Sequence, residues 1–266
     1  MGILKGKFIV GPVGPVNFRV VKGKNIVSAK PVKGTMKQTK GTIRVASTFG
    51  IANQLSSEMM ESFKKPISSF QDNLLFKRLT GRLRKIIYNA RDLHSDGYSF
   101  TGESFNPLSD FDFNIDSPLK MSLNTLPVVS LRDGLLRVVL DDLDNPKKIT
   151  YPMRSESCEI VVSMSLFRMT DGLKIPGAEY QRLKLKRYQD TISIHEFNYS
   201  IPAGCLCVVA LNMYYYSITD NYLSILNNKK FSPGSILATY YVPGEYTEDE
   251  SRKWVDMRRR LTIKIS

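Results

Sequence analysis

The chain has few of the side chains on which most catalytic and metal sites depend. Its 266 residues include two histidines, three cysteines and one tryptophan. His94 lies in a polar stretch and His195 on the expected polar face of TISIHEF, and neither stands in a nucleophile–base pattern. The chain has no Gly-x-Ser-x-Gly elbow and no phosphate loop ending in Gly-Lys-Ser/Thr. We therefore expect a protein that is not an enzyme, with no cofactor and no small-molecule substrate.

Cysteine is too scarce and too irregularly spaced for a disulfide framework. The three are Cys158, Cys205 and Cys207, and the last two lie in an apolar run where a strand would place both on one face. We expect reduced thiols in the core and no metal site. The acidic turn at 141–144 lacks the Asp-x-Asp-x-Asp-Gly spacing of a calcium loop.

Long apolar runs are absent. No run of about eighteen apolar residues could span a bilayer. Residues 1–21 are interrupted by Lys5, Lys7 and two Gly-Pro pairs, so they lack the apolar centre of a signal peptide. We expect no transmembrane segment and synthesis in the cytoplasm without a signal peptide, while the final location, including an assembled particle or filament, stays open.

Acidic side chains are missing from the first part of the chain. The first is Glu58, whereas residues 1–44 already hold ten lysines and arginines. The chain has a net charge of +13, and the charge is unevenly distributed. Residues 1–91 carry 18 basic and three acidic side chains, whereas residues 92–266 carry 20 basic and 22 acidic side chains. A basic part joined to a near-neutral body is typical of proteins that meet nucleic acid, a membrane surface or an acidic protein, including the acidic half of a neighbouring copy.

The basic residues accompany strand patterns, because apolar residues run through the segment and a solvated tail would lack them. We expect strands at 7–10, 18–21 and 25–29, a break at 11–15 and a tight turn at 22–24. A lone hairpin is marginally stable in water, so this basic β-arm, residues 1–44, must pack on its own chain or on another. The expected subunit contacts are Phe8, Val10, Phe18, Val20 and Ile26.

Residues 45–91 are predicted to be a helical segment. Apolar residues three and four apart predict one amphipathic helix from Thr42 to about Phe63 and a second from about Ser69 to Asn89. Basic residues crowd the polar side of the second helix. Together with the arm they form a surface that could face phosphate groups or acidic side chains: Lys5, Lys7, Arg19, Lys22, Lys24, Lys30, Lys77, Arg78, Arg82, Arg84 and Lys85.

The rest of the chain is predicted to be β-structure. Residues 92–118 have the composition of a linker, with 110–114 as a short edge strand anchoring two phenyl rings. Residues 119–266 predict an antiparallel immunoglobulin-like β-sandwich, which makes the chain α+β and mainly β. In its longest strand Tyr214 and Tyr216 share one face and Tyr215 the other, so one layer should be core and one exposed. The strands are expected at 126–131, 135–140, 159–169, 182–188, 191–197, 205–216, 236–242 and 261–265.

The opening segment combines a glycine-rich stretch, Gly11, Val13, Gly14 and Val16, with a Lys-Gly-Lys motif, Lys22, Gly23 and Lys24, that is followed by Val27 and Pro31. With these residues it resembles a family of uncharacterised proteins found across Bacteroidetes. Those proteins begin with a Met-Gly-Ile/Lys segment, a G-x-V-G-x-V stretch and a K-G-K/R-x-x-V-R/S-x-x-P motif. The similarity continues with 45–50, which is similar to a helix rich in Ala, Ser and Phe, and with 112–119, which is similar to an F-x-F-N-x-x-x-P-L motif. The resemblance implies that arm, helices and sandwich form one evolved unit, and it implies no catalytic residue or ligand.

Two functions remain open on these grounds. The first is a self-assembling structural protein, a homo-oligomer or polymer whose arm adds strands to a neighbour's sheet edge and so builds a filament, ring or shell. The alternative is a nucleic-acid-binding or packaging protein whose arm and second helix face phosphate groups.

Overall fold

The computed structural model describes residues 2–30, 39–65, 71–92, 95, 97–141, 148–188, 193–219, 222–246, 252–258 and 261–265. The chain divides into two compact units, Met1–Ser47 and Thr48–Ser266. Both are built mainly from antiparallel strands, so the mainly β class with helices and N-terminal strands is confirmed. The predicted boundaries at 91 and 118 fall inside the second unit.

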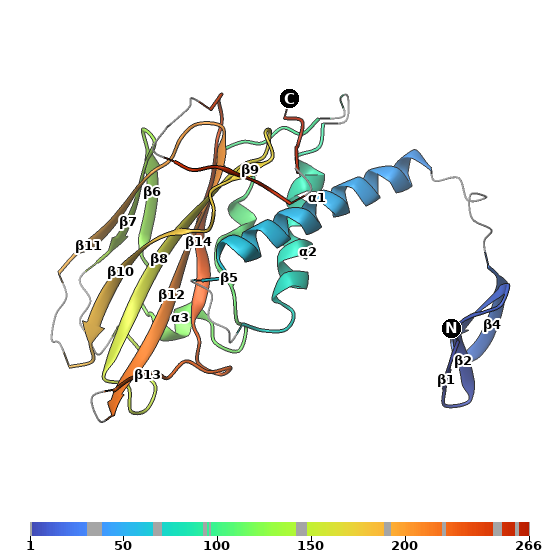
Figure 1. Ribbon diagram of the computed structural model, residues 1–266, viewed down its shortest axis with the longest axis horizontal. Helices are drawn as coiled ribbons and strands as arrows, with labels where there is room; N and C mark the ends of the chain where they lie inside the picture. Colours follow the sequence, from blue (N-terminus) through green and yellow to red (C-terminus); the bar gives the residue numbers. More distant parts are fainter. Residues whose placement is uncertain are drawn as a thin grey trace. The chain divides into compact units, whose positions relative to one another are not determined.

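The first unit contains a four-stranded antiparallel meander, here called the arm sheet (Figure 1). Its strands are β1 (Ile3–Lys5), β2 (Phe8–Val13), β3 (Val16–Val21) and β4 (Lys24–Ala29). Two-residue turns join them at eight-residue intervals, at 6–7, 14–15 and 22–23. At Lys22-Gly23 both φ angles are positive, 49° and 74°, as a type I′ hairpin turn requires. The predicted hairpin at this turn is confirmed.

The arm sheet corrects the expectation that the segment 11–15 interrupts the strands. Gly11 and Pro12 lie within β2, where they pair with Phe18 and Asn17 of β3. Gly11 has a φ of 107°, a conformation open to glycine, and this local irregularity accommodates the proline inside a strand. The arm sheet therefore has four strands, including β1, which the apolar pattern did not predict.

Two helices supply one outer layer of the second unit. They are α1 (Lys40–Ser62), which belongs to this unit from Thr48 onward, and α2 (Leu75–Asn89). Their apolar stripes meet in a core that includes Leu55 and Met59 of α1 and Leu79 and Leu83 of α2. Both predicted helices are confirmed, although α2 begins at Leu75 and not near Ser69: residues 71–74 are described and are not helical. Residues 66–70 lie outside the described residues.

The main sheet of the second unit has eight strands in the order β15-β9-β8-β12-β14-β5, with β10 paired to β8 and β13 paired to β12. Its bounds are β5 Phe111–Asp112, β8 Ser157–Arg168, β9 Leu173–Lys174, β10 Glu179–Lys186, β12 Cys205–Thr219, β13 Tyr222–Ile225, β14 Gly234–Val242 and β15 Val255–Asp256.

A three-stranded sheet forms the third layer, in the order β11-β7-β6, on the side of the main sheet opposite the helices (Figure 1). Its strands are β6 (Val128–Arg132), β7 (Leu135–Leu140) and β11 (His195–Ser200). Phe197 and Val138 from this sheet share a core with Ile160 and Val209 of the main sheet. The Tyr199 hydroxyl donates a 2.8 Å hydrogen bond to the Val162 carbonyl and so ties the two sheets together. Two facing sheets are present, and the immunoglobulin-like detail stays a prediction.

Residues 97–118, expected as a linker, carry part of the helical core. Phe100, Phe105 and Leu108 are buried there, the last in a 3-10 helix at Asn106–Leu108. Phe111 and Phe113 are also buried, and β5 pairs with β14 at the edge of the sheet, so the predicted edge strand with two anchored rings is confirmed. A short helix, α3 (Leu119–Ser122), follows.

The strand expected at 261–265 is not formed in the described part of that segment. Ile265 makes a single bridge to Tyr98, while Leu261 and Ile263 are buried in the helical core. The alternating apolar residues of 261–265 pack on the core, but the segment does not pair as a strand. The turn at 189–190 and most of the acidic turn, 142–147, lie outside the described residues.

Candidate functional site

The face of the main sheet that packs against the helices continues past them and becomes an open surface. On β12, Leu206, Val208 and Ala210 are in the helical core, whereas Tyr214 and Tyr216 on the same face are half-buried. In Figure 1 the lower ends of β10, β12 and β13 extend beyond α1 and α2. The residues of this open sheet face are Ser157, Glu159, Val161, Tyr180, Arg182, Lys184, Lys186, Tyr214, Tyr216, Leu223 and Ile225.

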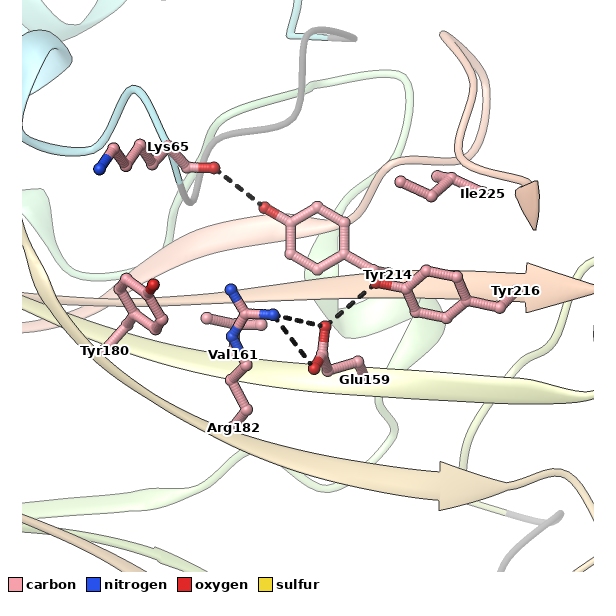
Figure 2. Close-up of a pocket in the computed structure, with 8 residues that line it drawn as sticks. All are labelled: Lys65, Glu159, Val161, Tyr180, Arg182, Tyr214, Tyr216 and Ile225. Carbon is pink, nitrogen blue, oxygen red and sulfur yellow. Dashed lines mark hydrogen bonds and ion pairs between the residues drawn. The ribbon is translucent and has the colours of Figure 1, made fainter. Parts of the chain in front are cut away.

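Strand alternation places the tyrosines as the sequence predicts. Tyr215 is fully buried in the core between the two sheets, with its ring edge-on to Phe231. Tyr214 and Tyr216 point the opposite way, toward the open sheet face, and both line a hollow with a cavity volume of about 230 Å³. Figure 2 shows this hollow with Tyr214 standing over it, its hydroxyl 3.5 Å from the Lys65 carbonyl oxygen.

Among the described residues that line the hollow, Glu159 is the only carboxylate, and it is buried, with 3% of its surface exposed. Both of its carboxylate oxygens lie 3.4 Å from Nη1 of Arg182, and the Tyr216 hydroxyl donates to Oε2 at 3.1 Å. Burial of a carboxylate costs free energy of folding unless the group is paired with a cation and hydrogen-bonded. Arg182 supplies the cation, and Tyr216 supplies a hydrogen bond. Glu159 thereby fixes the orientation of Arg182 and Tyr216 (Figure 2).

The electrostatics of this cluster hold Tyr216 and Arg182 in defined charge states. Burial and the nearby charge of Glu159 raise the pKa of Tyr216 to about 12. Burial acts to lower the pKa of Arg182, but the charge and hydrogen bonding of Glu159 outweigh it and the net shift is upward. Tyr216 is thus a neutral hydroxyl and Arg182 a permanent cation near neutral pH.

The walls of the hollow are aromatic and cationic. Tyr180 is 47% exposed, and the Arg182 guanidinium lies 4.8 Å from its ring centroid. A second hollow of about 450 Å³ adjoins the first, shares Glu159, Arg182 and Tyr216 with it, and adds Lys184 and Lys186. These groups can bind and orient an anion or a flat ring. Glu159 is not available to a ligand, because it is paired with Arg182.

The arm residues expected to contact a neighbouring subunit lie on both faces of the arm sheet. The register pairs Phe18 with Val27, and Val20 lies on the same face as Phe18. Ile26 pairs with Arg19 and lies on the opposite face. Phe8 and Val10 are half-buried, and the Lys7 ammonium lies 5.5 Å from the Phe8 ring centroid. The basic residues of the arm, Lys5, Lys7, Arg19, Lys22, Lys24 and Lys30, are exposed.

The basic residues of α2 fall into two groups. Arg78 and Arg82 lie over the Phe111 ring, 4.7 and 5.0 Å from its centroid, and donate to backbone carbonyls of Asp112 and Pro107. They serve the packing of the helix against 105–113. Three others are exposed and could meet a charged partner: Lys77, Arg84 and Lys85.

The remaining candidates from the sequence carry no assembled centre in the described part of the chain. His195 is half-buried with its ring edge-on to Phe197, 4.7 Å between centroids, so it lies on the inner face of β11 and not on the polar face expected. The alternation begins at His195 itself and turns Glu196 outward. Cys158, Cys205 and Cys207 are buried with free thiols, and within the described ranges no group of three His, Cys, Asp or Glu side chains could hold a metal. His94 lies outside these ranges.

The apolar pattern of the sequence does not predict the open sheet face, although the sequence holds two signals for it. Glu159 is an acidic residue inside the apolar run CEIVVSMSLF, and Arg182, Lys184 and Lys186 alternate with other residues in RLKLK. A lone acid within a buried strand and cations on one face of a neighbouring strand predict pairing across the sheet. Which strands are neighbours, however, is a property of the topology.

No protein-family model, curated protein or solved structure matches the chain. Among the described residues, no helix is both long and apolar enough to cross a membrane.

Proposed function

We propose that this chain is a non-enzymatic structural protein that self-assembles, with its arm sheet docking on a neighbouring copy by β-strand addition to build a filament, ring or shell. The observation that carries the proposal is that none of residues 2–30 is buried, although they form four paired strands. A sheet gains its stability from an apolar face packed against something else. An arm sheet without buried residues therefore calls for a further surface.

The apolar side chains that need covering lie on both faces of the arm sheet. Exposed fractions are 62% for Ile3, 71% for Leu4, 47% for Val13 and 52% for Val27. Apolar surface contributes roughly 25 cal/mol per Å² when it is removed from water. Burial of these aliphatic side chains against a neighbour supplies the driving force for docking.

Strand addition adds main-chain hydrogen bonds to this apolar burial. β1 and β4 are the outer strands of the arm sheet, and no other strand among the described residues pairs with either. Unpaired edge strands offer rows of N–H and C=O groups to another chain. Lys5 and Lys24 on these edges are the kind of charged residue that limits indiscriminate pairing, so a specific partner edge is favoured.

The alternative, nucleic-acid binding through the arm and α2, is less well supported by the positions of the α2 residues. Arg78 and Arg82 are engaged with Phe111 and backbone carbonyls, which leaves a shorter basic row on this helix.

The test is the mass of the full-length protein in solution, measured by light scattering at tens of micromolar. We expect a mass that is a multiple of the 30.2 kDa chain and that persists between about 50 and 200 mM salt, conditions over which phosphate-driven binding falls steeply. The double variant Val20→Asp and Val27→Asp places two carboxylates on one face of the arm sheet and should give monomers. The matched control, Met121→Asp and Met153→Asp, changes two exposed residues of the second unit and should assemble normally.

Two outcomes would refute the proposal. One is a wild-type protein that has the mass of a single chain at these concentrations. The other is assembly that survives the two arm substitutions unchanged while circular dichroism shows both variants to be folded.

A further inference from the structure

The open sheet face carries a row of cations that the proposed assembly does not use. Arg182, Lys184 and Lys186 lie on one face of β10, where they oppose Val161, Glu159 and Ser157 of β8. Residues two apart on a strand are separated by roughly 7 Å, so the three cations form an evenly spaced line. Lys184 and Lys186 are exposed, and the Arg182 side chain is 50% exposed.

Among the described residues of this face, cations outnumber carboxylates. The two adjoining hollows are lined by Arg182, Lys184 and Lys186 and by one described carboxylate, Glu159, while Lys65 turns its backbone carbonyl toward Tyr214 (Figure 2). That carboxylate is buried and already bound to Arg182 and Tyr216, so it offers little to repel an incoming anion. A shallow site lined with several cations raises the local concentration of anionic ligands.

Aromatic rings lie directly beside the cationic row. Tyr180, Tyr214 and Tyr216 line the first hollow, with Val161 at its floor, and Tyr180 is 47% exposed (Figure 2). Leu223 and Ile225 of β13 extend the apolar rim and are 64% and 59% exposed. Flat rings can stack on such tyrosines while attached phosphate groups reach the cations.

From this arrangement we infer that the open sheet face binds single-stranded nucleic acid. A cationic groove that follows the backbone, with aromatic side chains for the bases, is the general chemistry of single-strand binding. The phosphate groups lie along Arg182, Lys184 and Lys186, and the bases enter the two hollows. Because stacking accepts any base, the site has little sequence preference. A duplex keeps its bases stacked inside and cannot place them on Tyr180.

Charge argues against the arm of a second copy as the occupant. Residues 2–30, which form the arm sheet, have six basic side chains and no acidic one, so they would be repelled by the cationic row. The inferred site is therefore independent of the assembly proposed above, and either can fail without the other.

The experiment measures binding of a labelled oligothymidylate to the full-length protein by fluorescence anisotropy over a range of salt concentrations. Lys184→Gln with Lys186→Gln removes two phosphate contacts and should lower the slope of log K against log salt by about 1.4, at about 0.7 per contact. The charge-matched control, Lys229→Gln with Lys230→Gln, alters two exposed lysines outside the hollows and should leave the slope unchanged. Any contacts that the arm makes with the oligonucleotide contribute equally to the slope of the two double variants, so the difference between their slopes does not depend on the arm.

A second pair of variants tests the stacking. Tyr180→Ala should weaken binding roughly 5- to 150-fold, the range found for one lost base–aromatic stack. Tyr188→Ala, a tyrosine 79% exposed that does not line either hollow, should bind like the wild type. The inference is overturned if both lysine pairs change the slope equally, or if Tyr180→Ala binds normally. It is also overturned if duplex DNA or a sulfated polysaccharide binds as tightly as the oligothymidylate.

Discussion

The ammonium nitrogen of Lys174 lies 2.7 Å from Oε2 of Glu58, and the two side chains are 7% and 0% exposed. The contact is a buried ion pair. Oε1 of Glu58 accepts the backbone N–H of Arg258 at 2.8 Å, and Lys174 reaches Oε2 of Glu61 at 3.0 Å. Glu58 thus joins α1, β9 and the C-terminal segment within one unit.

Removal of the cation from this pair should destabilise the protein strongly. Lys174→Met leaves the Glu58 carboxylate buried without its counter-charge, and we expect a loss of about 3–5 kcal/mol in the free energy of unfolding. Urea denaturation followed by circular dichroism measures it. The double variant Lys174→Met with Glu58→Gln removes the uncompensated charge and should recover much of the loss. A single variant as stable as the wild type would show that the pair is not formed in solution.

The exposed member of the same cluster predicts a dependence on pH. The hydrogen bond from Lys174 is the largest influence on the pKa of Glu61, and burial opposes it. Together with the charge of Lys174 and a contribution from Arg258, that hydrogen bond lowers the pKa of Glu61 below its usual value of 4.5. A carboxyl whose folded pKa is lowered contributes stability above its unfolded pKa, and this is lost as the pH falls through the folded pKa. We therefore expect thermal stability to decline below about pH 4.5 less steeply in Glu61→Gln than in the wild type. Equal slopes in both proteins would contradict the assignment.

The ionisation of Asp112 should change stability with pH in the opposite direction to that of Glu61. Burial raises its pKa above the usual 3.8, against the lowering effects of the Leu119 N–H and the charge of Arg78. A raised folded pKa means that ionisation opposes folding, so stability is greatest below the unfolded pKa and falls as the pH rises through the folded pKa. Asp112→Asn keeps an acceptor for the Leu119 N–H, now 3.0 Å from Oδ1. It should raise the melting temperature at pH 7 and leave it unchanged near pH 3, as calorimetry can measure.

Features that depend on neighbours in sequence could be predicted closely. The hairpin at Lys22-Gly23, the helix that ends near Phe63 and the alternation around Tyr215 each follow from local backbone preference or from the period of apolar residues. The edge strand at Phe111 was predicted for the same reason, although its residues looked like a linker.

Features that depend on which strands meet could not be predicted. Glu159 and Arg182 are 23 residues apart in sequence and become partners because β8 and β10 pair in one register. Glu58 and Arg258 are separated by 200 residues. Composition gives the charge of such residues, but only the strand order places an acid against its cation. The apolar pattern does not predict the full arm sheet, because glycine and proline are typical of a break and here lie within β2; the eight-residue spacing of the turns is the signal that indicates four strands.

Two glycines offer a final prediction that separates the arm from the body of the protein. Gly81 lies inside α2 with no atom within 4 Å of an added Cβ, so Gly81→Ala should stabilise the protein by about 0.5–1 kcal/mol, since alanine loses less backbone freedom than glycine on folding. Gly23 also has open space around it, but its φ of 74° is strained for alanine. Gly23→Ala should cost the arm sheet roughly 1–2 kcal/mol and weaken the β3–β4 pairing.

The two substitutions have the same chemistry, so their comparison isolates the effect of position. Urea denaturation of the full-length protein should show a gain for Gly81→Ala and an unchanged main transition for Gly23→Ala, because the turn lies in the first unit. Light scattering should show the reverse pattern, with weaker assembly only for Gly23→Ala. If Gly23→Ala assembles as well as the wild type, the turn is not needed for docking, and the arm would have to act through its side chains without the β3–β4 hairpin.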